Sequence, residues 1–484
     1  MTEISKLIKG LFQVLCLIII DLIAFYISLF IAWTFRAEVI PSFTFISNLP
    51  VFNFSYTYFL SLWWIPAVFV FFIFYEALYD SNLPFWDEAR NLVKSLSLAS
   101  ITVMAIVTLG KMGDRVSRLV LLSMWVLSIF VFPIFRLWGK KFLYNIGIRR
   151  EKVLILGAGN AGRLVMEGLQ REKYMGYDVI GFLDDDEQKM RNTINGKKVF
   201  GRINQFPEFI KEMGIKTAII AMPSIPANKF SDLTASVQNH AINTIVIPDL
   251  KGIALLNTDL LHLFYEEIFL MNIKNNLKSI MNRFIKRLFD ISVSIITMPL
   301  IFPIIGIIGI IIRLETPGPA IYAHDRVGRN GKIFRCYKFR TMHRDAEEEL
   351  KEMLNKNEKI RNEWLENWKL RDDPRITKIG CFLRKTSLDE LPQIFNVIKG
   401  EMSLVGPRPV TKEEIEKHYK ETGKLFLSVL PGITGLWQVS GRTNTGYDYR
   451  VKLDAWYIMN WSLWLDIAII FKTIRVVVKM EGAY

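Results

Sequence analysis

The chain has 484 residues, of which 51% are hydrophobic and only 22% are charged, and its formal net charge is +14. This length allows about three folding units, the apolar content excludes an intrinsically disordered protein, and the low charged fraction indicates that part of the chain lies in lipid. Three cysteines exclude a disulfide framework, five scattered histidines argue against a zinc site, and the positive charge suits an anionic membrane leaflet or a phosphate-bearing substrate.

Long apolar stretches dominate the first 145 residues. They cover residues 10–35, 39–75, 95–110 and 119–135, and Asp21 is the only charge in the first of them. Each stretch can cross a hydrocarbon core about 30 Å thick. Basic residues gather before the first stretch and after the fourth, at Lys6, Lys9, Arg136, Lys140, Lys141, Arg149 and Arg150. We therefore predict an all-α, four-helix transmembrane region over residues 1–145 with both ends in the cytoplasm.

Residues 146–275 have the pattern of an α/β, Rossmann-like domain. An apolar strand enters the turn Gly157-Ala-Gly159-Asn-Ala-Gly162, which opens a helix. In such a turn Gly157 allows the tight bend, Gly159 lets a pyrophosphate approach the backbone, and Gly162 permits close packing of helix on strand. A second strand ends at Asp184, near the place of a ribose-binding acid. These four residues are candidate nucleotide-binding positions, but many such turns bind nothing, so the ligand stays open.

A fifth uncharged stretch runs from residue 291 to residue 312. Its length fits a transmembrane helix, but Pro299 and Pro303 lie in its middle, where each removes a backbone hydrogen bond. Basic residues flank both of its ends, at Arg283, Lys286 and Arg287 and then at Arg313, Arg326, Arg329 and Lys332. Because both ends favour the positive side of the membrane, we predict a re-entrant helix at about residues 286–313. A spanning helix is the alternative.

The last domain, residues 276–484, carries the residues suited to chemistry. Its Gly- and Pro-rich loops contain Arg326, Arg329, Lys338, Arg340, Arg375, Arg384, Lys385 and Arg408. Several such groups in one cleft would bind a pyrophosphate, because guanidinium groups match phosphate oxygens. Each of them singly is equally consistent with a solvated surface or a lipid contact.

Two adjacent carboxylates, Asp389 and Glu390, follow Thr386 and Ser387, either of which can cap a short helix. The dyad would then lie in the first helical turn, where the helix dipole favours ionised acids. Such a pair can hold Mg²⁺, and one member can act as a nucleophile. An ordinary acidic helix start is the alternative. Asp466, the one acid in its apolar segment, is either a structural carboxylate or a site residue.

Several strings in this region carry a resemblance to a known family. They are Lys286-Arg-Leu-Phe-Asp290, Pro319-Ala-Ile-Tyr322, Arg326-Val-Gly-Arg329, Tyr337-Lys-Phe-Arg-Thr-Met342, Ser387-Leu-Asp-Glu-Leu-Pro-Gln393, Val405-Gly-Pro-Arg-Pro409, Pro431-Gly-Ile-Thr-Gly-Leu-Trp-Gln438 and Ser440-Gly-Arg442. Together they resemble the catalytic domain of the monotopic phosphoglycosyl transferases, a mainly α domain with a re-entrant helix. The membrane helices and the Rossmann-like domain resemble the large form of that family.

The resemblance implies transfer of a sugar 1-phosphate from a UDP-sugar to undecaprenyl phosphate, with galactose favoured and glucose next. Asp389 would attack the β-phosphate and release UMP, and the polyprenol phosphate would attack the covalent intermediate. Glu390 would support Asp389, and both would hold Mg²⁺. Substrate- or phosphate-binding positions would be Arg326, Lys338, Arg340, Arg408 and Asp466. Phe302 stands where the family has Ser before Pro303, which leaves the kink angle open.

The implied setting is the bacterial inner membrane, with the catalytic domain on the cytoplasmic face and O-antigen, capsule or exopolysaccharide as the product pathway. The partners would be a UDP-sugar, undecaprenyl phosphate and membrane lipid, not nucleic acid, and a homodimer stays open. One alternative is a membrane nucleotide-sugar dehydratase or epimerase, but no Tyr here has the required Lys four residues later. The other is a membrane scaffold that senses a nucleotide.

Overall fold

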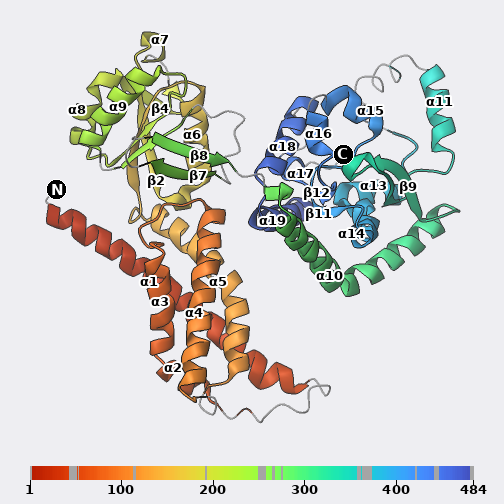
Figure 1. Cartoon of the computed structure of the whole chain (residues 1–484), viewed down its shortest axis with the longest axis horizontal. Coiled ribbons are helices and arrows are strands. Elements are labelled where there is room, and N and C mark those ends of the chain that lie inside the picture. The colour runs from red at the N-terminus through yellow and green to blue at the C-terminus, as the bar shows by residue number, and fades with distance from the viewer. Residues whose placement is uncertain are drawn as a thin grey trace. The chain divides into compact units, whose positions relative to one another are not determined.

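The computed structural model describes residues 3–42, 52, 54–112, 116–190, 193–241, 243–248, 258–263, 268–273, 276–356, 361, 373–419, 422–440 and 446–479. It divides into two compact units, Met1–Leu250 and Lys251–Tyr484 (Figure 1). The first unit contains the predicted transmembrane region and the predicted α/β domain up to residue 250. The second unit contains the predicted catalytic domain together with residues 251–275, which the sequence pattern predicts as part of the α/β domain.

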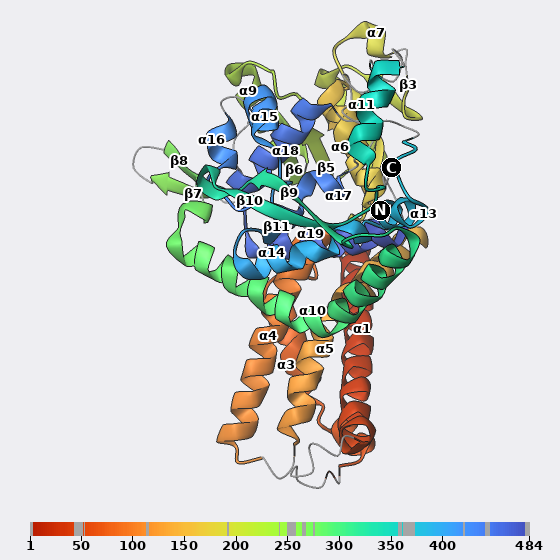
Figure 2. The ribbon, with the colours of Figure 1, turned by 90° about the vertical axis from the view of Figure 1, so that its right-hand side faces the viewer.

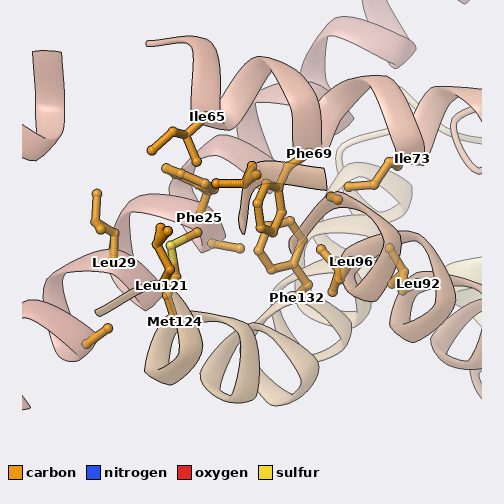
Figure 3. Close-up of a cluster of buried hydrophobic side chains, with 14 of the residues drawn as sticks. Phe25, Leu29, Ile65, Phe69, Ile73, Leu92, Leu96, Leu121, Met124 and Phe132 are labelled. Carbon is orange, nitrogen blue, oxygen red and sulfur yellow. The ribbon is translucent and has the colours of Figure 1, made fainter. Parts of the chain in front are cut away.

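Apolar helices form the membrane region of the first unit. They are α1 (Glu3–Thr34), α2 (Tyr56–Ser61), α3 (Trp64–Tyr75), α4 (Phe85–Leu109) and α5 (Arg118–Asn145), and α1 continues through the turns Phe35–Val39 and Ile40–Ser42. Their side chains meet in a buried cluster that includes Phe25, Phe69, Leu96 and Phe132 (Figure 3). Among the described residues, Gly10–Ser42, Phe85–Leu109 and Arg118–Asn145 of this unit, and Ile280–Glu315 of the second unit, are long and apolar enough to cross a membrane.

The second predicted span differs from our expectation of one long helix, because the chain breaks between α2 and α3. Leu62 leaves helical geometry there, with φ −82° and ψ 55°. Pro66 explains the break, since its ring would clash with the carbonyl of residue 62 in a continuous helix. The 12 residues of α3 reach only about 18 Å, so α3 by itself is shorter than the hydrocarbon core.

A buried ion cluster joins the membrane helices. Arg136 on α5 pairs with Asp21 on α1 at 2.7 Å and with Glu88 on α4 at 2.9 Å, and Lys140 pairs with Glu88 at 2.6 Å. All four side chains are at most 5% exposed. Their formal charges cancel, which is how charged residues are tolerated among apolar helices. Asp21, the only charged residue of the first apolar stretch, therefore joins α1 to α5 through Arg136.

An open, mainly parallel sheet forms the rest of the first unit. Its strands lie in the order β3 (Thr193–Ile194), β4 (Lys197–Gly201), β2 (Tyr177–Leu183), β1 (Glu151–Leu156), β5 (Thr217–Ile220) and β6 (Asn243–Val246), and only β3 is antiparallel. Helices α8 (Phe206–Met213) and α9 (Ala227–His240) cover one face, and α6 (Asn160–Arg171) covers the other; α7 (Glu187–Met190) follows β2. The alternation along β1 explains this, because Leu154 and Leu156 pack on one face and Val153 and Ile155 on the other. The α/β class predicted for this region is confirmed.

The second unit is mostly helical around small sheets. Its elements are the hairpin β7 (Thr258–Leu263) and β8 (Ile268–Ile273), α10 (Ile280–Glu315), the hairpin β9 (Ile321–Val327) and β10 (Ile333–Phe339), α11 (Ala346–Lys356), α13 (Lys378–Thr386), the 3₁₀ helix η8 (Leu388–Gln393), α14 (Ile394–Lys399), the parallel pair β11 (Ser403–Val405) and β12 (Gly432–Thr434), α15 (Lys412–Glu414), the π-helical turn η9 (Ile415–Tyr419), α16 (Gly423–Phe426), α17 (Leu436–Val439), α18 (Tyr447–Met459) and α19 (Leu463–Lys479).

Helix α10 bends sharply in its middle, as Figures 1 and 2 show. Pro299 and Pro303 lie inside the helix and weaken its hydrogen-bond ladder there. Asp290 in the first half accepts hydrogen bonds from Ser403 and Leu404, while the second half packs through Ile305, Ile308 and Ile312 into a core cluster with α13 and α14. A straight helix of 36 residues would be about 54 Å long. The bend thus lets both halves pack on the same unit.

Candidate active site

The carboxylate dyad lies where α13 passes into η8. Asp389 and Glu390 are in the first turn of η8, as predicted. The predicted hydroxyl cap is wrong: Thr386 Oγ1 donates to the Phe382 carbonyl inside α13, and Ser387 makes no side-chain cap. Ser387 instead takes a left-handed conformation, with φ 56°, and ends α13. The left-handed turn at Ser387, rather than a side-chain cap, therefore places Asp389 and Glu390 at the start of η8.

Two predicted basic residues reach the dyad from other elements. Lys338 on β10 places its Nζ 2.7 Å from Glu390 Oε1 and 3.9 Å from Asp389 Oδ2. Arg408, which follows β11, places a guanidinium nitrogen 3.6 Å from the same Glu390 oxygen. The side chains of Lys338 and Arg408 remain 28% and 34% exposed. Both cations can therefore also meet a ligand from solution.

The electrostatics at the dyad suit a reactive carboxylate. Burial raises the pKa of Asp389 above its ordinary value. The positive charge of Lys338 lowers this pKa, the negative charge of Glu390 raises it further, and Arg408 and Arg384 lower it, with a net increase. The sequence places Arg384 among the basic residues of this domain but does not assign it to the dyad. Burial lowers the pKa of Arg384 while Asp389 opposes the change, and the guanidinium donates to Thr341 Oγ1 at 3.0 Å. Its position five residues before Asp389, one helical turn and a corner away, is the signal that could have identified it.

Two other predicted phosphate-binding residues are engaged elsewhere. Arg340 donates to the carbonyls of Thr316 and Pro317 at 2.7 and 2.8 Å, and so holds the chain that leaves α10. Arg326 pairs with Glu414 at 3.1 Å. The structure thus brings Lys338 and Arg408 to the dyad, whereas Arg340 and Arg326 have different partners.

Asp466 lies in a separate, fully buried network. Its carboxylate accepts from Lys286 Nζ at 2.6 Å, from the Tyr457 hydroxyl at 2.7 Å and from Trp461 Nε1 at 3.0 Å, and the residue is 0% exposed. Lys286 and Tyr457 also donate to the Val405 carbonyl at 3.0 and 3.1 Å. Of the two alternatives left open by the sequence, this arrangement favours the structural carboxylate. Through Lys286 and Tyr457, Asp466 helps to hold the Val405 carbonyl and therefore the segment that leads to Arg408.

The glycine turn of the α/β domain has the predicted geometry. Gly157 has φ 104°, and a Cβ there would collide with Met222 and Ala221. A Cβ on Gly162 would collide with the Gly157 carbonyl, whereas one on Gly159 would meet open space.

Asp184, the predicted ribose-binding acid, is engaged within its own domain. It accepts from the Ala158 amide at 2.7 Å and from Lys189 Nζ at 3.3 Å. Nucleotide binding by these residues stays a prediction.

The donor set at the dyad can be compared with what Mg²⁺ requires. In the described part of the chain, no three His, Cys, Asp or Glu side chains gather as a metal site. Mg²⁺, however, commonly uses one or two carboxylates together with substrate phosphates and water. Asp389 and Glu390 supply two such carboxylates, and Glu390 raises the pKa of Asp389, a repulsion that a divalent cation relieves. The residues fit the ion when a phosphate-bearing substrate is present.

Adjacent acids with nearby cations, on a unit that carries a long apolar helix, suit the binding of phosphate-bearing substrates at a membrane. Residues 281–480 match the family model described as bacterial sugar transferase, and residues 78–248 match one described as CoA-binding domain. The chain is 40% identical over 411 residues to the undecaprenyl-phosphate galactose phosphotransferase of Salmonella typhimurium, covering 84% of each chain. The chain belongs to the bacterial sugar transferase family.

Two further relatives differ in the sugar that they are named for. Over 199 residues, 41% of this chain and 43% of the relative, the sequence is 54% identical to the galactosyl transferase CpsE of Streptococcus agalactiae. Over 346 residues, 69% of each chain, it is 33% identical to the UDP-glucose:undecaprenyl-phosphate glucose-1-phosphate transferase of Escherichia coli. The transfer of a sugar 1-phosphate to undecaprenyl phosphate is thus represented among its homologues.

Proposed function

We propose that this protein transfers galactose 1-phosphate from UDP-galactose to undecaprenyl phosphate and releases UMP. The family and the names of the Salmonella and Escherichia relatives support the reaction class. Galactose is supported by the Salmonella and Streptococcus relatives, which are more similar to this chain than the glucose-specific relative. The product would enter O-antigen, capsule or exopolysaccharide synthesis.

The observation that carries the mechanism is the contact of Lys338 with both acids, at 2.7 Å to Glu390 and 3.9 Å to Asp389. In the first half-reaction an Asp389 oxygen forms a bond to the β-phosphorus, and the bond from that phosphorus to UMP breaks. In the second, a phosphate oxygen of the lipid attacks the same phosphorus, and the bond to Asp389 breaks. A carboxylate with a raised pKa is a stronger nucleophile once ionised, and Lys338 and Arg408 oppose the charge of the phosphates.

Asp389 and Glu390 would hold Mg²⁺ through their carboxylate oxygens. When bound, the ion would neutralise the pyrophosphate and polarise its oxygens. Glu390 also keeps Lys338 beside the dyad. Its role in this chain is therefore to orient a cation as well as to contribute a metal ligand.

We further propose that α10 enters the cytoplasmic leaflet of the bacterial inner membrane and returns. Its bend at the two prolines and the packing of both halves on one unit support this geometry. Many of its outward side chains are apolar and exposed, for example Phe284, Leu288, Ile296, Leu300 and Ile307. A surface of this kind suits lipid, and it would hold the dyad near the headgroups where the lipid phosphate lies.

The test is the release of nucleotide by Asp389→Asn protein in detergent with Mg²⁺, UDP-galactose and undecaprenyl phosphate. We expect wild-type protein to release UMP and label the lipid, and the variant to lose both while its thermal unfolding is unchanged. Asp345→Asn, at an exposed position, is the matched control and should stay active. Release of UDP in place of UMP, or wild-type activity in Asp389→Asn, would contradict the mechanism. UMP release with UDP-glucose alone would correct the sugar and keep the mechanism.

A further inference from the structure

The hairpin β9–β10 presents one face that continues beyond the dyad. Its register pairs Lys338 with Tyr322 and Arg326 with Phe334. Side chains alternate along a strand and paired residues share a face, so Lys338 and Arg326 lie on the same face, four positions apart. That separation is about 13 Å along the strand. An extended nucleoside diphosphate can span it.

Cys336 on β10 shares this face of the hairpin and lies between the positions of the two cations; it is 2% exposed and packs in a cluster with Val397 and Met402, so it forms the floor of the stretch between them. Burial raises the pKa of its thiol, and Lys338, Glu390, Arg326 and Arg408 also act on that pKa. These four charged groups therefore surround one short stretch of the hairpin. Lys338, Glu390 and Arg408 belong to the dyad end of it, and Arg326 belongs to the far end.

At the far end, Glu414 is a carboxylate held in place from several sides. Its Oε1 lies 3.1 Å from Arg326, its Oε2 accepts from the Tyr447 hydroxyl at 2.7 Å, and Arg450 lies 3.8 Å away. It also closes the capping box of α15 with Thr411. Burial by itself would raise the pKa of Glu414, but the hydrogen bond from Tyr447 and the charges of Arg450 and Arg326 lower it overall. The side chain is nevertheless 31% exposed, so it is a fixed, ionised acceptor that solvent can reach.

This end of the hairpin is tied to the dyad end by short connections. Val327, next to Arg326, donates its amide to the Val410 carbonyl at 2.9 Å. Arg450 donates to the carbonyl of Arg408 at 3.5 Å. Arg408 in turn lies 3.6 Å from Glu390. Hydrogen bonds and one ion pair therefore hold the Arg326 end and the dyad end of this face together.

We infer that Arg326 and Glu414 form the nucleoside end of the donor site. This inference rests on the proposed function and extends it to the part of the substrate that does not react. The pyrophosphate lies between Lys338 and Arg326, and one ribose hydroxyl donates to Glu414. Carboxylates are the usual acceptors for ribose hydroxyls, and each carboxylate oxygen has about two acceptor sites. Glu414 Oε1 already accepts from Arg326 and from the amide and hydroxyl of Thr411, whereas Oε2 accepts from the Tyr447 hydroxyl at 2.7 Å and has Arg450 at 3.8 Å, so Oε2 is the oxygen that can receive the hydroxyl.

The variant Glu414→Gln tests this inference, because Gln has the same size and also closes a capping box. The readout is kcat/KM for each substrate separately, since in a ping-pong reaction each value reports only its own half-reaction. We expect kcat/KM for UDP-galactose to fall about tenfold or more, as when one hydrogen bond to a charged group is lost. The value for undecaprenyl phosphate should not change. The matched control is Glu413→Gln, at the exposed neighbouring position, which should behave as wild type.

A substrate lacking the 2′-hydroxyl, 2′-deoxy-UDP-galactose, provides a second measurement that does not depend on the folding of a variant. Wild-type protein should use it about tenfold less efficiently than UDP-galactose, whereas Glu414→Gln should show little further loss. Equal use of both donors by wild-type protein would overturn the inference. An equal loss in both half-reactions of Glu414→Gln, or unchanged donor kcat/KM, would also overturn it. Wild-type protein that releases no UMP would instead refute the proposed function.

Discussion

Replacement of Asp466 distinguishes a structural from a chemical role for this residue. Asp466→Asn removes the negative charge that faces Lys286 Nζ at 2.6 Å, and Lys286 is itself only 9% exposed. The ammonium group would then lie in the core without its counter-charge. Losing one partner of a buried ion pair costs about 3–5 kcal/mol. In a domain of about 200 residues, each kcal/mol lowers the melting temperature by about 2–4 °C, so we expect a decrease of about 10 °C.

The assay is thermal unfolding in detergent, followed by UMP release well below the lowered melting temperature. Because Asp466 acts through Lys286 and Tyr457 on the Val405 carbonyl, we expect reduced but measurable turnover in Asp466→Asn. The double variant Lys286→Met/Asp466→Asn contains neither charge and should melt higher than Asp466→Asn. A melting temperature within about 2 °C of wild type together with abolished UMP release would refute the structural role and place Asp466 in the chemistry.

Two further predictions concern the dyad and the bent helix. Lys338→Met should lower kcat/KM for the donor by about a hundredfold or more, as loss of a charge-stabilising group does. It should also move the acid limb of the pH–rate profile to higher pH, because Lys338 lowers the pKa of Asp389 and only ionised Asp389 attacks. Lys332→Met, at an exposed position of the same hairpin, is its control, and an unmoved limb would contradict the assignment. Single cysteines replacing Ile285 and Leu314, near the two ends of α10, should react with an impermeant thiol reagent from the cytoplasmic side only; labelling from opposite sides would show that α10 spans the membrane.

The sequence by itself determined the features that depend on neighbouring residues. Long uncharged runs predicted the membrane helices, because crossing a bilayer requires consecutive apolar residues. The pattern around Gly157 predicted a strand, a tight turn and a helix, and these are present. The position of Asp389 and Glu390 in a first helical turn was also predictable, since it depends on a few adjacent residues. The break in the second span is also a local effect, because Pro66 prevents a continuous helix through residue 62.

Only the tertiary structure decided which distant residues meet. Lys338 and Arg408 reach the dyad, whereas Arg340, two positions from Lys338, holds Thr316 and Pro317 instead. Spacing cannot separate these outcomes, because each depends on how strands and helices far apart in the chain pack. The same holds for charges in apolar surroundings. Asp466 is paired with a lysine 180 residues away, and burial without that partner would be prohibitive, so its role followed from packing and not from its own segment.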